Sequence, residues 1–336
     1  MLVTSTYFGN VTCLHKTYPD ARIYCNQGRQ ASANEGEQLM NTTLSRRTFA
    51  KVLGGTLASM GLVACGNSNS GSDSTDATNA DTAKSGTGFR TVDQIKDSGT
   101  VIIGVFSDKA PFGYVDDAGE YQGYDVEFAK RLADDLGVQV KWVATDPANR
   151  VPFLESNKVD ITMANFTVTP ERAEKVDFSL PYMKVQLGVV SPDKAKITSV
   201  DQLKDKTLIV AKGTTAETYF EAEHPEIKLQ KYDQYADAYN ALLDGRGDAF
   251  STDNTEVLAW AIQNPGYTVG IEALGNTDTI AAAVAKGNET LLSYINDEIK
   301  KLGSENFFHE DYAKTLEPVY GDAANPDNLV VEGGQL

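Results

Sequence analysis

From residue 89 to residue 322, strand-like and helix-like segments alternate along the chain. Val101–Phe106 is a β-branched run suited to a buried parallel strand. Tyr124–Leu136 places its apolar residues on shared helical faces and ends at Gly137, a residue typical of helix caps. A strand, a short helix and another strand follow at Val138–Val143, Val151–Ser156 and Val159–Met163. This βαβαβ order predicts an open parallel sheet with helices on both faces.

The alternation begins again after residue 200. Strands and helices are predicted in turn at Thr207–Val210, Thr215–Glu223, Leu229–Tyr232, Tyr235–Leu243, Asp248–Ser251 and Val257–Ile262. A strand-like segment at Ile280–Val284 and an amphipathic helix at Leu291–Leu302 complete the pattern. We therefore expect two similar α/β lobes, each a mainly parallel sheet flanked by helices, with a cleft between them. Ligands of open α/β sheets bind beyond the carboxyl ends of the strands.

The segment before residue 89 resembles an export signal followed by a linker. Residues 45–51 have a twin-arginine pattern, and the following apolar run is too short to span a membrane comfortably. The run ends in a lipoprotein-like cleavage box at Cys65, which predicts a signal peptide over 40–64 and lipid attachment to Cys65. A short buried helix is the alternative. Residues 65–88 have the composition of a flexible tether, and 1–39 are interpreted as an unassigned or non-native extension.

Composition excludes several functional classes. The net charge of −17 argues against binding to nucleic acid, which requires a basic face. No cysteine follows Cys65, and the three histidines lie far apart, so neither a disulfide framework nor a metal site is expected. The chain has no Walker-type loop, so it is not expected to hydrolyse ATP.

Candidate ligand-binding residues follow the predicted strands. Thr169 and Pro170 predict the start of a helix, with exposed backbone N–H groups that favour an anion. Arg172 adds a planar, two-pronged donor for a carboxylate. The alternative is a surface arginine paired with Glu171 or Glu174.

Two further junctions carry polar residues. Thr214 and Thr215 enter a helix and offer hydroxyl and N–H groups, although an ordinary helix cap is equally compatible. Asp253 lies beyond a strand, where it would hold an ammonium group or, alternatively, cap the next helix. An arginine opposite a strand-end aspartate would bind both charges of a zwitterion, provided that both partners are present.

The chain resembles the polar-amino-acid branch of bacterial extracellular solute-binding proteins. The resemblance covers nearly all of 89–334 and rests on segments 123–126, 157–160, 169–172, 176–182 and 213–215. It implies a hinged periplasmic-binding-protein fold, with the first lobe at 89–187 and 281–322, the second at 188–280, and a tail at 323–336. It also implies that Arg172 holds the α-carboxylate with Thr167 and Thr215, and that Asp253 holds the α-amino group.

Within that family, the chain is similar to cysteine-binding lipoproteins in segments 104–106, 148–151, 164–167, 181–185, 253–255 and 331–334. The resemblance thus adds Asn165, Phe166 and Thr214 to the ligand site. Phe106 makes the side-chain end more apolar, which suits a small thiol. Arg150 and Tyr235 resemble acidic-amino-acid binders, so aspartate or glutamate stays open as the ligand.

These resemblances imply a lipid-anchored monomer that delivers a free amino acid, with cysteine favoured, to an ABC permease in the membrane. No cofactor and no enzymatic activity are expected. Two other classes stay open. A dehydratase-like enzyme would need a general acid such as Glu217, and a surface adhesin would carry a cleft without a ligand.

Overall fold

A computed structural model describes residues 5–8, 11–14 and 88–336. The chain divides into two compact units, Met1–Thr78 and Asn79–Leu336. In the first unit, β1 (Ser5–Phe8) and β2 (Val11–Leu14) form an antiparallel pair, which the sequence analysis did not predict. The predicted signal peptide, Cys65 and all of the predicted tether except Gly88 lie outside the described residues.

The second unit contains an eight-stranded sheet in the order β11-β10-β12-β9-β13-β8-β3-β7. In the first lobe, β3 (Thr100–Val105) pairs in parallel with β7 (Gln139–Ala144) and with β8 (Ile161–Thr162). The helices of this part are α1 (Val92–Ser98), α2 (Tyr124–Leu136) and α3 (Arg150–Glu155). A small second sheet consists of β4 (Asp108–Lys109), β5 (Gly113–Val115) and β6 (Tyr121–Gln122).

Helix α2 shows how the sequence sets these boundaries. Its buried residues recur at helical spacing and include Phe128, Leu132 and Leu136. Gly137 then adopts the left-handed conformation, and its N–H donates to the carbonyl oxygens of Ala133 and Asp134. The predicted cap is therefore confirmed.

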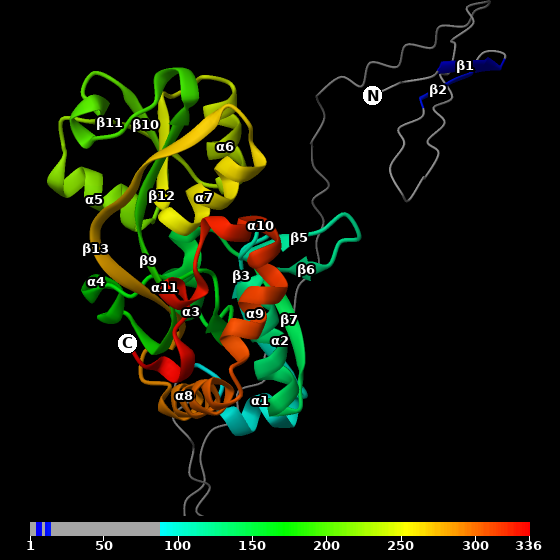
Figure 1. The fold of residues 1–336 in the computed structure, drawn as a ribbon. Coiled ribbons are helices and arrows are strands. Elements are labelled where there is room, and N and C mark those ends of the chain that lie inside the picture. Colours follow the sequence, from blue (N-terminus) through cyan, green and yellow to red (C-terminus); the bar gives the residue numbers. More distant parts are fainter. Residues whose placement is uncertain (1–4, 9–10, 15–87) are drawn as a thin grey trace, which may run out of the picture. The chain divides into compact units, whose positions relative to one another are not determined.

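The second lobe repeats the arrangement. Its strands β10 (Thr207–Ala211), β11 (Lys228–Tyr232) and β12 (Ala249–Asp253) are parallel to one another. Its helices are α5 (Thr215–Glu223), α6 (Tyr235–Leu243) and α7 (Asn254–Gln263). The expected two-lobed α/β fold with mainly parallel sheets is therefore confirmed (Figure 1).

Two long antiparallel strands join the lobes. β9 (Val176–Pro192) and β13 (Tyr267–Ala285) pair with each other along most of their length. At one end β9 pairs with β12 of the second lobe, and at the other β13 pairs with β8 of the first. Register shifts interrupt the ladder between Val269 and Ala283. The sequence analysis predicted only Ile280–Val284 of this pair.

The chain returns to the first lobe after β13 (Figure 1). Helices α8 (Glu289–Ser304), α9 (Phe307–Thr315), α10 (Glu317–Tyr320) and α11 (Pro326–Leu329) follow. Ile295, Ile299 and Phe308 of α8 and α9 join the same buried core as Val101 and Phe128. The second lobe has its own cores, one around Phe250 and one around Phe220. The cluster around Phe250 also includes Phe106 and Ala164 of the first lobe, so the apolar packing continues from one lobe to the other.

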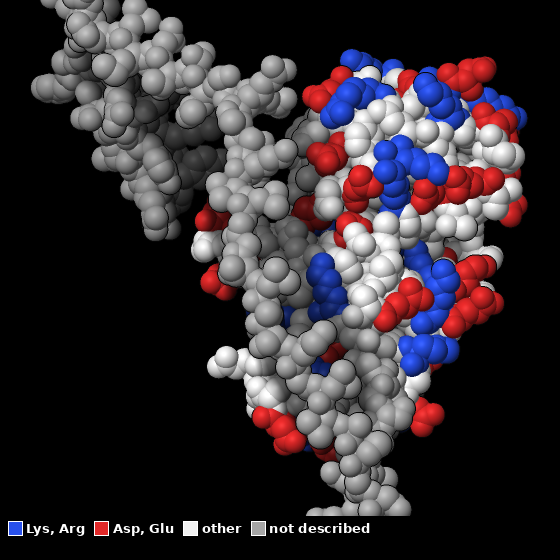
Figure 2. Space-filling view, turned by 180° about the vertical axis from the view of Figure 1, so that it is seen from behind, with Lys and Arg blue, Asp and Glu red and all other residues white. Residues whose placement is uncertain are grey.

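Figure 2 shows Lys/Arg and Asp/Glu side chains interspersed over the back of the molecule. Among the described residues, no helix is both long and apolar enough to cross a membrane. Within the same residues, no three His, Cys, Asp or Glu side chains gather as metal ligands would.

Candidate ligand-binding site

The predicted site residues lie where the two lobes meet, at the carboxyl ends of their strands. This is the position that an open α/β sheet favours for a ligand. Arg172 and Thr215 are half-buried. The other eight side chains are buried: Phe106, Arg150, Asn165, Phe166, Thr167, Thr214, Tyr235 and Asp253. The lobes therefore close over the residues that the sequence singled out.

Arg172 is anchored by a short helix and reaches across the cleft. Thr169 caps α4 (Pro170–Ala173), with Pro170 in its first turn, as predicted. The Nη1 group of Arg172 donates to the carbonyl of Thr167 at 2.7 Å, and Nη2 donates to the carbonyl of Gly213 in the second lobe at 2.9 Å. These contacts rule out the alternative in which Arg172 pairs with a neighbouring glutamate.

Arg150 begins α3 and is buried rather than exposed on a helix surface. Its guanidinium donates only to carbonyl oxygens, those of Pro147, Ala164, Asn165 and Gly213, at 3.0–3.2 Å. The carbonyl of Gly213 thus accepts from both arginines.

The two guanidinium groups share one environment. Both lie over the ring of Phe166, with the guanidinium carbon 4.6 Å from its centroid for Arg150 and 5.1 Å for Arg172. Burial lowers the pKa of each arginine, and the charge of Arg150 lowers the pKa of Arg172 further. Neither group forms an ion pair with a carboxylate of residues 88–336. A buried and a half-buried cation, both held by neutral acceptors, make this a site for an anion.

Thr214 and Thr215 have different roles. The hydroxyl of Thr214 accepts from the N–H of Glu217 at 3.2 Å and donates to the carbonyl of Ala211 at 2.7 Å, so it caps α5. The cap that was the alternative for Thr214 is therefore present, and a contact between Thr214 and the ligand stays a prediction. Thr215 is the first residue of α5, on the cleft side of the turn that holds Gly213.

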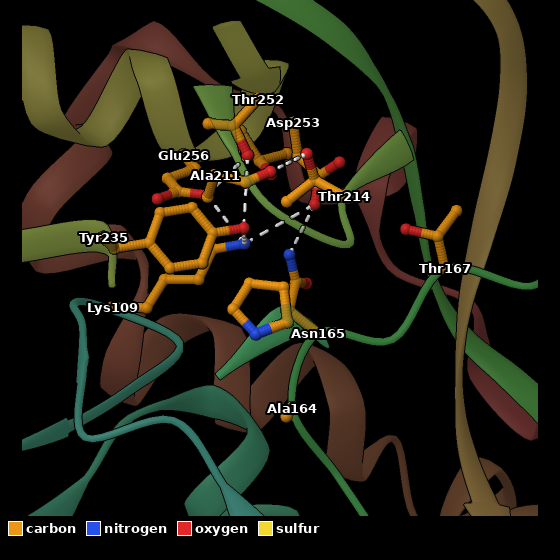
Figure 3. Close-up of polar contacts among 12 residues, drawn as sticks. Lys109, Ala164, Asn165, Thr167, Ala211, Thr214, Tyr235, Thr252, Asp253 and Glu256 are labelled. Carbon is orange, nitrogen blue, oxygen red and sulfur yellow. Dashed lines mark hydrogen bonds and ion pairs between the residues drawn. The ribbon is translucent and has the colours of Figure 1, made fainter. Parts of the chain in front are cut away.

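Asp253 faces the other end of the cleft. It is the last residue of β12 and precedes α7, but its side chain makes no cap hydrogen bond, so the capping alternative is wrong. Its Oδ2 accepts from the amide of Asn165 in the first lobe at 2.6 Å (Figure 3). Asn165 has a positive φ of 40°, and its N–H donates to Asp125 at 2.6 Å. The buried Oδ1 of Asn165 has no hydrogen-bond partner. It can therefore accept a hydrogen bond from a ligand that binds beside the Asp253 carboxylate.

The sequence analysis missed Lys109. This side chain is only 1% exposed, and its Nζ lies 2.6 Å from Glu256 Oε2 and 3.6 Å from Asp253 Oδ2. Nζ also donates to the hydroxyl of Tyr235 at 3.2 Å (Figure 3). Its position shortly after β3, at a predicted strand end, was the one available signal.

Two aromatic rings lie beside Lys109 in the cleft. Phe106 and Tyr235 meet edge to face, with centroids 5.4 Å apart. Burial raises the pKa of Tyr235 to about 12, so its hydroxyl stays protonated and neutral. Lys109 Nζ lies 5.3 Å from the Phe106 centroid, so a cation that was not predicted from the sequence lies beside this ring.

Glu217 is engaged away from the cleft. Its Oε2 accepts from the N–H of Gly213 at 2.6 Å, and its Oε1 pairs with Lys231 at 2.8 Å. A carboxylate held by a lysine and a backbone N–H stabilises the loop and is poorly suited to donate a proton.

Comparison with known proteins agrees with this geometry. Residues 101–317 match the bacterial extracellular solute-binding proteins, family 3. The chain is 30% identical over 276 residues to the glutamine-binding protein GlnH of Bacillus subtilis, covering 81% of this chain and 97% of that protein. A solute receptor for L-cysteine from Neisseria gonorrhoeae is 52% identical with a TM-score of 0.71, covering 72% of this chain and 100% of the receptor. A cysteine-binding protein from Campylobacter jejuni is 53% identical with a TM-score of 0.71, covering 72% and 98% respectively. The chain belongs to family 3 of the bacterial extracellular solute-binding proteins.

Proposed function

We propose that this chain is the substrate-binding lipoprotein of an amino-acid ABC importer and that it captures L-cysteine by its zwitterion. One observation carries the proposal: the guanidinium groups of Arg150 and Arg172, which have no carboxylate partner in residues 88–336, lie in the same cleft as the Asp253 carboxylate. In this proposal Arg172 holds the α-carboxylate, supported by Thr167 and Thr215. Asp253 and the free Oδ1 of Asn165 receive the α-ammonium group.

Closure of the lobes connects ligand binding to transport. Gly213 of the second lobe accepts hydrogen bonds from Arg150 and Arg172 of the first, so these contacts exist only when the lobes meet. The paired strands β9 and β13 join the lobes and are the hinge. A ligand that binds both lobes favours the closed form, which the permease then recognises.

The choice of cysteine rests on two supports. Structures of cysteine-binding proteins are 52% and 53% identical to this chain, and the aromatic pair of Phe106 and Tyr235 suits a small thiol. The acidic alternative draws on Arg150 and Lys109. Lys109 is already paired with Glu256, which leaves Arg150 as the cation available to pair with an acidic side chain.

A thermal-shift screen of the full chain against all free amino acids, with cysteine kept reduced, tests the ligand. A ligand that binds the folded state raises the melting temperature by mass action. We expect L-cysteine to give the largest shift. A larger shift with aspartate or glutamate would favour the alternative, and no shift with any amino acid would refute amino-acid binding.

Lipid anchoring and export belong to the same proposal. They rest on the twin-arginine pattern and on Cys65, both outside the described residues. In a bacterial host, Cys65→Ala should release the protein from the membrane fraction. Retention of that variant in the membrane would contradict the anchor.

A further inference from the structure

Lys109 links the two lobes through buried charges. It lies on β4 in the first lobe, whereas its polar partners Glu256, Asp253 and Tyr235 all belong to the second. Glu256 is held in place by the hydroxyl of Tyr239 and by that of Thr252 at 3.1 Å. A buried ion pair is stable only when further hydrogen bonds satisfy both groups, and this pair has them.

The charge of Lys109 is retained inside the protein. Burial alone would lower its pKa, but the charges of Glu256 and Asp253 raise it above the ordinary value. The amine is therefore a fixed cation beside Asp253, the residue assigned to the ligand ammonium. The Oδ2 of Asp253 accepts from the amide of Asn165 at 2.6 Å, and Lys109 Nζ lies 3.6 Å from the same oxygen.

Lys109 also occupies the aromatic surfaces of the site. Its Nζ lies 4.5 Å from the centroid of Tyr235, 5.3 Å from that of Phe106 and 5.7 Å from that of Phe112. The guanidinium of Arg150 lies 5.6 Å from the Phe106 centroid. Aromatic faces attract cations, and here Lys109 and Arg150 already lie near the aromatic rings of the site. A ligand with a cationic side chain would meet two like charges in a space of low dielectric constant.

We propose that Lys109 is a positioning and selectivity residue, which orients Asp253 toward the ligand ammonium and excludes amino acids with cationic side chains. The inference rests on the proposed function, because it assigns Asp253 to the α-ammonium group. It extends that function from the zwitterion, which all amino acids share, to the side chain, which distinguishes them.

The test compares L-cysteine with L-2,3-diaminopropionate, in which an amino group replaces the thiol. Isothermal titration at about pH 6, where that amino group is charged, gives the ratio of the two dissociation constants. The variants are Lys109→Met and the double variant Lys109→Met/Glu256→Gln, which leaves no unpaired charge at this position. Lys300→Met is the matched control, since Lys300 pairs with Asp297 on the exposed surface.

We expect the double variant to bind L-cysteine at least tenfold more weakly than the wild type, and its preference for cysteine over the cationic analogue to fall at least tenfold. The control should change neither quantity. Thermal unfolding identifies a single variant that fails to fold, and the double variant then carries the test. Wild-type affinity and an unchanged ratio in the double variant would show that Lys109 is only a counterion of Glu256.

The outcomes separate the two proposals. If the wild-type chain binds no amino acid, the proposed function fails, and this inference fails with it. If the wild type binds L-cysteine but the double variant has the same ratio of dissociation constants as the wild type, only the inference fails. A wild-type preference for lysine or arginine would overturn the exclusion of cationic ligands directly.

Discussion

Gly213→Ala is a direct test of closure, because Gly213 is the point where the second lobe touches the arginines of the first. Its φ of +76° favours glycine, and an added Cβ would lie 2.6 Å from the Cα of Ala148 in the first lobe. The substitution removes no side chain from the site. It should therefore act on the approach of the lobes rather than on a contact with the ligand.

The magnitude follows from the contact distances. An ordinary Cβ contact begins at 3.4 Å, so relieving the clash separates the backbones by about 0.8 Å. The bonds from Arg150 and Arg172 to the Gly213 carbonyl, 3.1 and 2.9 Å long, would then exceed hydrogen-bonding distance. Each bond to a charged donor contributes about 1.5–3 kcal/mol. A loss of about 3 kcal/mol or more from the closed form predicts roughly 100-fold weaker binding.

Gly245→Ala provides the matched control. Gly245 has a φ of +70° in the same lobe, but no atom lies within 4 Å of its added Cβ. Both variants should lose about 1 kcal/mol of folding stability from the strained conformation, whereas only Gly213→Ala should lose affinity. Isothermal titration with L-cysteine measures affinity, and thermal unfolding measures stability. Equal affinities for the two variants would refute the closure argument.

Three further predictions concern single side chains. Arg172→Ala should weaken binding of every amino acid at least 100-fold by titration, whereas Arg131→Ala, which removes only surface ion pairs, should not; near-normal affinity would refute the carboxylate assignment. Phe106→Lys should move the preference about tenfold toward aspartate or glutamate in competition titrations, and an unchanged ranking would contradict its place at the side-chain end. Burial raises the pKa of Asp125 from 3.8 to about 6, so the folded chain holds this proton more tightly. The wild type should therefore lose about 2 kcal/mol of stability relative to Asp125→Asn as pH rises from about 4 to 6, and equal pH dependence in urea unfolding would contradict this.

The elements that sequence predicts well are those with a local pattern. Helices α2, α5 and α6 begin and end at the predicted residues, because apolar spacing and caps are contained within each segment. The long strands β9 and β13 were largely missed. They pass from one lobe to the other, their ladder is interrupted by register shifts, and their partners lie far away in sequence. No local period describes such strands.

The site shows the same limit. Asp253 could be proposed because it follows a strand at the edge where ligands bind, whereas Arg150 was proposed only from the resemblance to amino-acid-binding proteins. Lys109 could not, because its burial depends on Glu256, which only the folded chain brings within 2.6 Å. Thr214 shows the opposite case, because its hydroxyl accepts a hydrogen bond from a backbone N–H in the first turn of the helix that follows it.

The contrast between these charges supports a zwitterion over other ligands. Lys109 has Glu256 as its nearest ionic partner at 2.6 Å, so it does not require a ligand as its counterion. Arg172 is oriented by carbonyl oxygens, whose partial charges fix its direction without cancelling its charge. Asp253 accepts from the amide of Asn165 and lies farther from Lys109, at 3.6 Å. The cleft therefore retains positive charge at the arginines and negative charge at Asp253. A simple carboxylate would satisfy only the first and a simple amine only the second, whereas a free amino acid satisfies both.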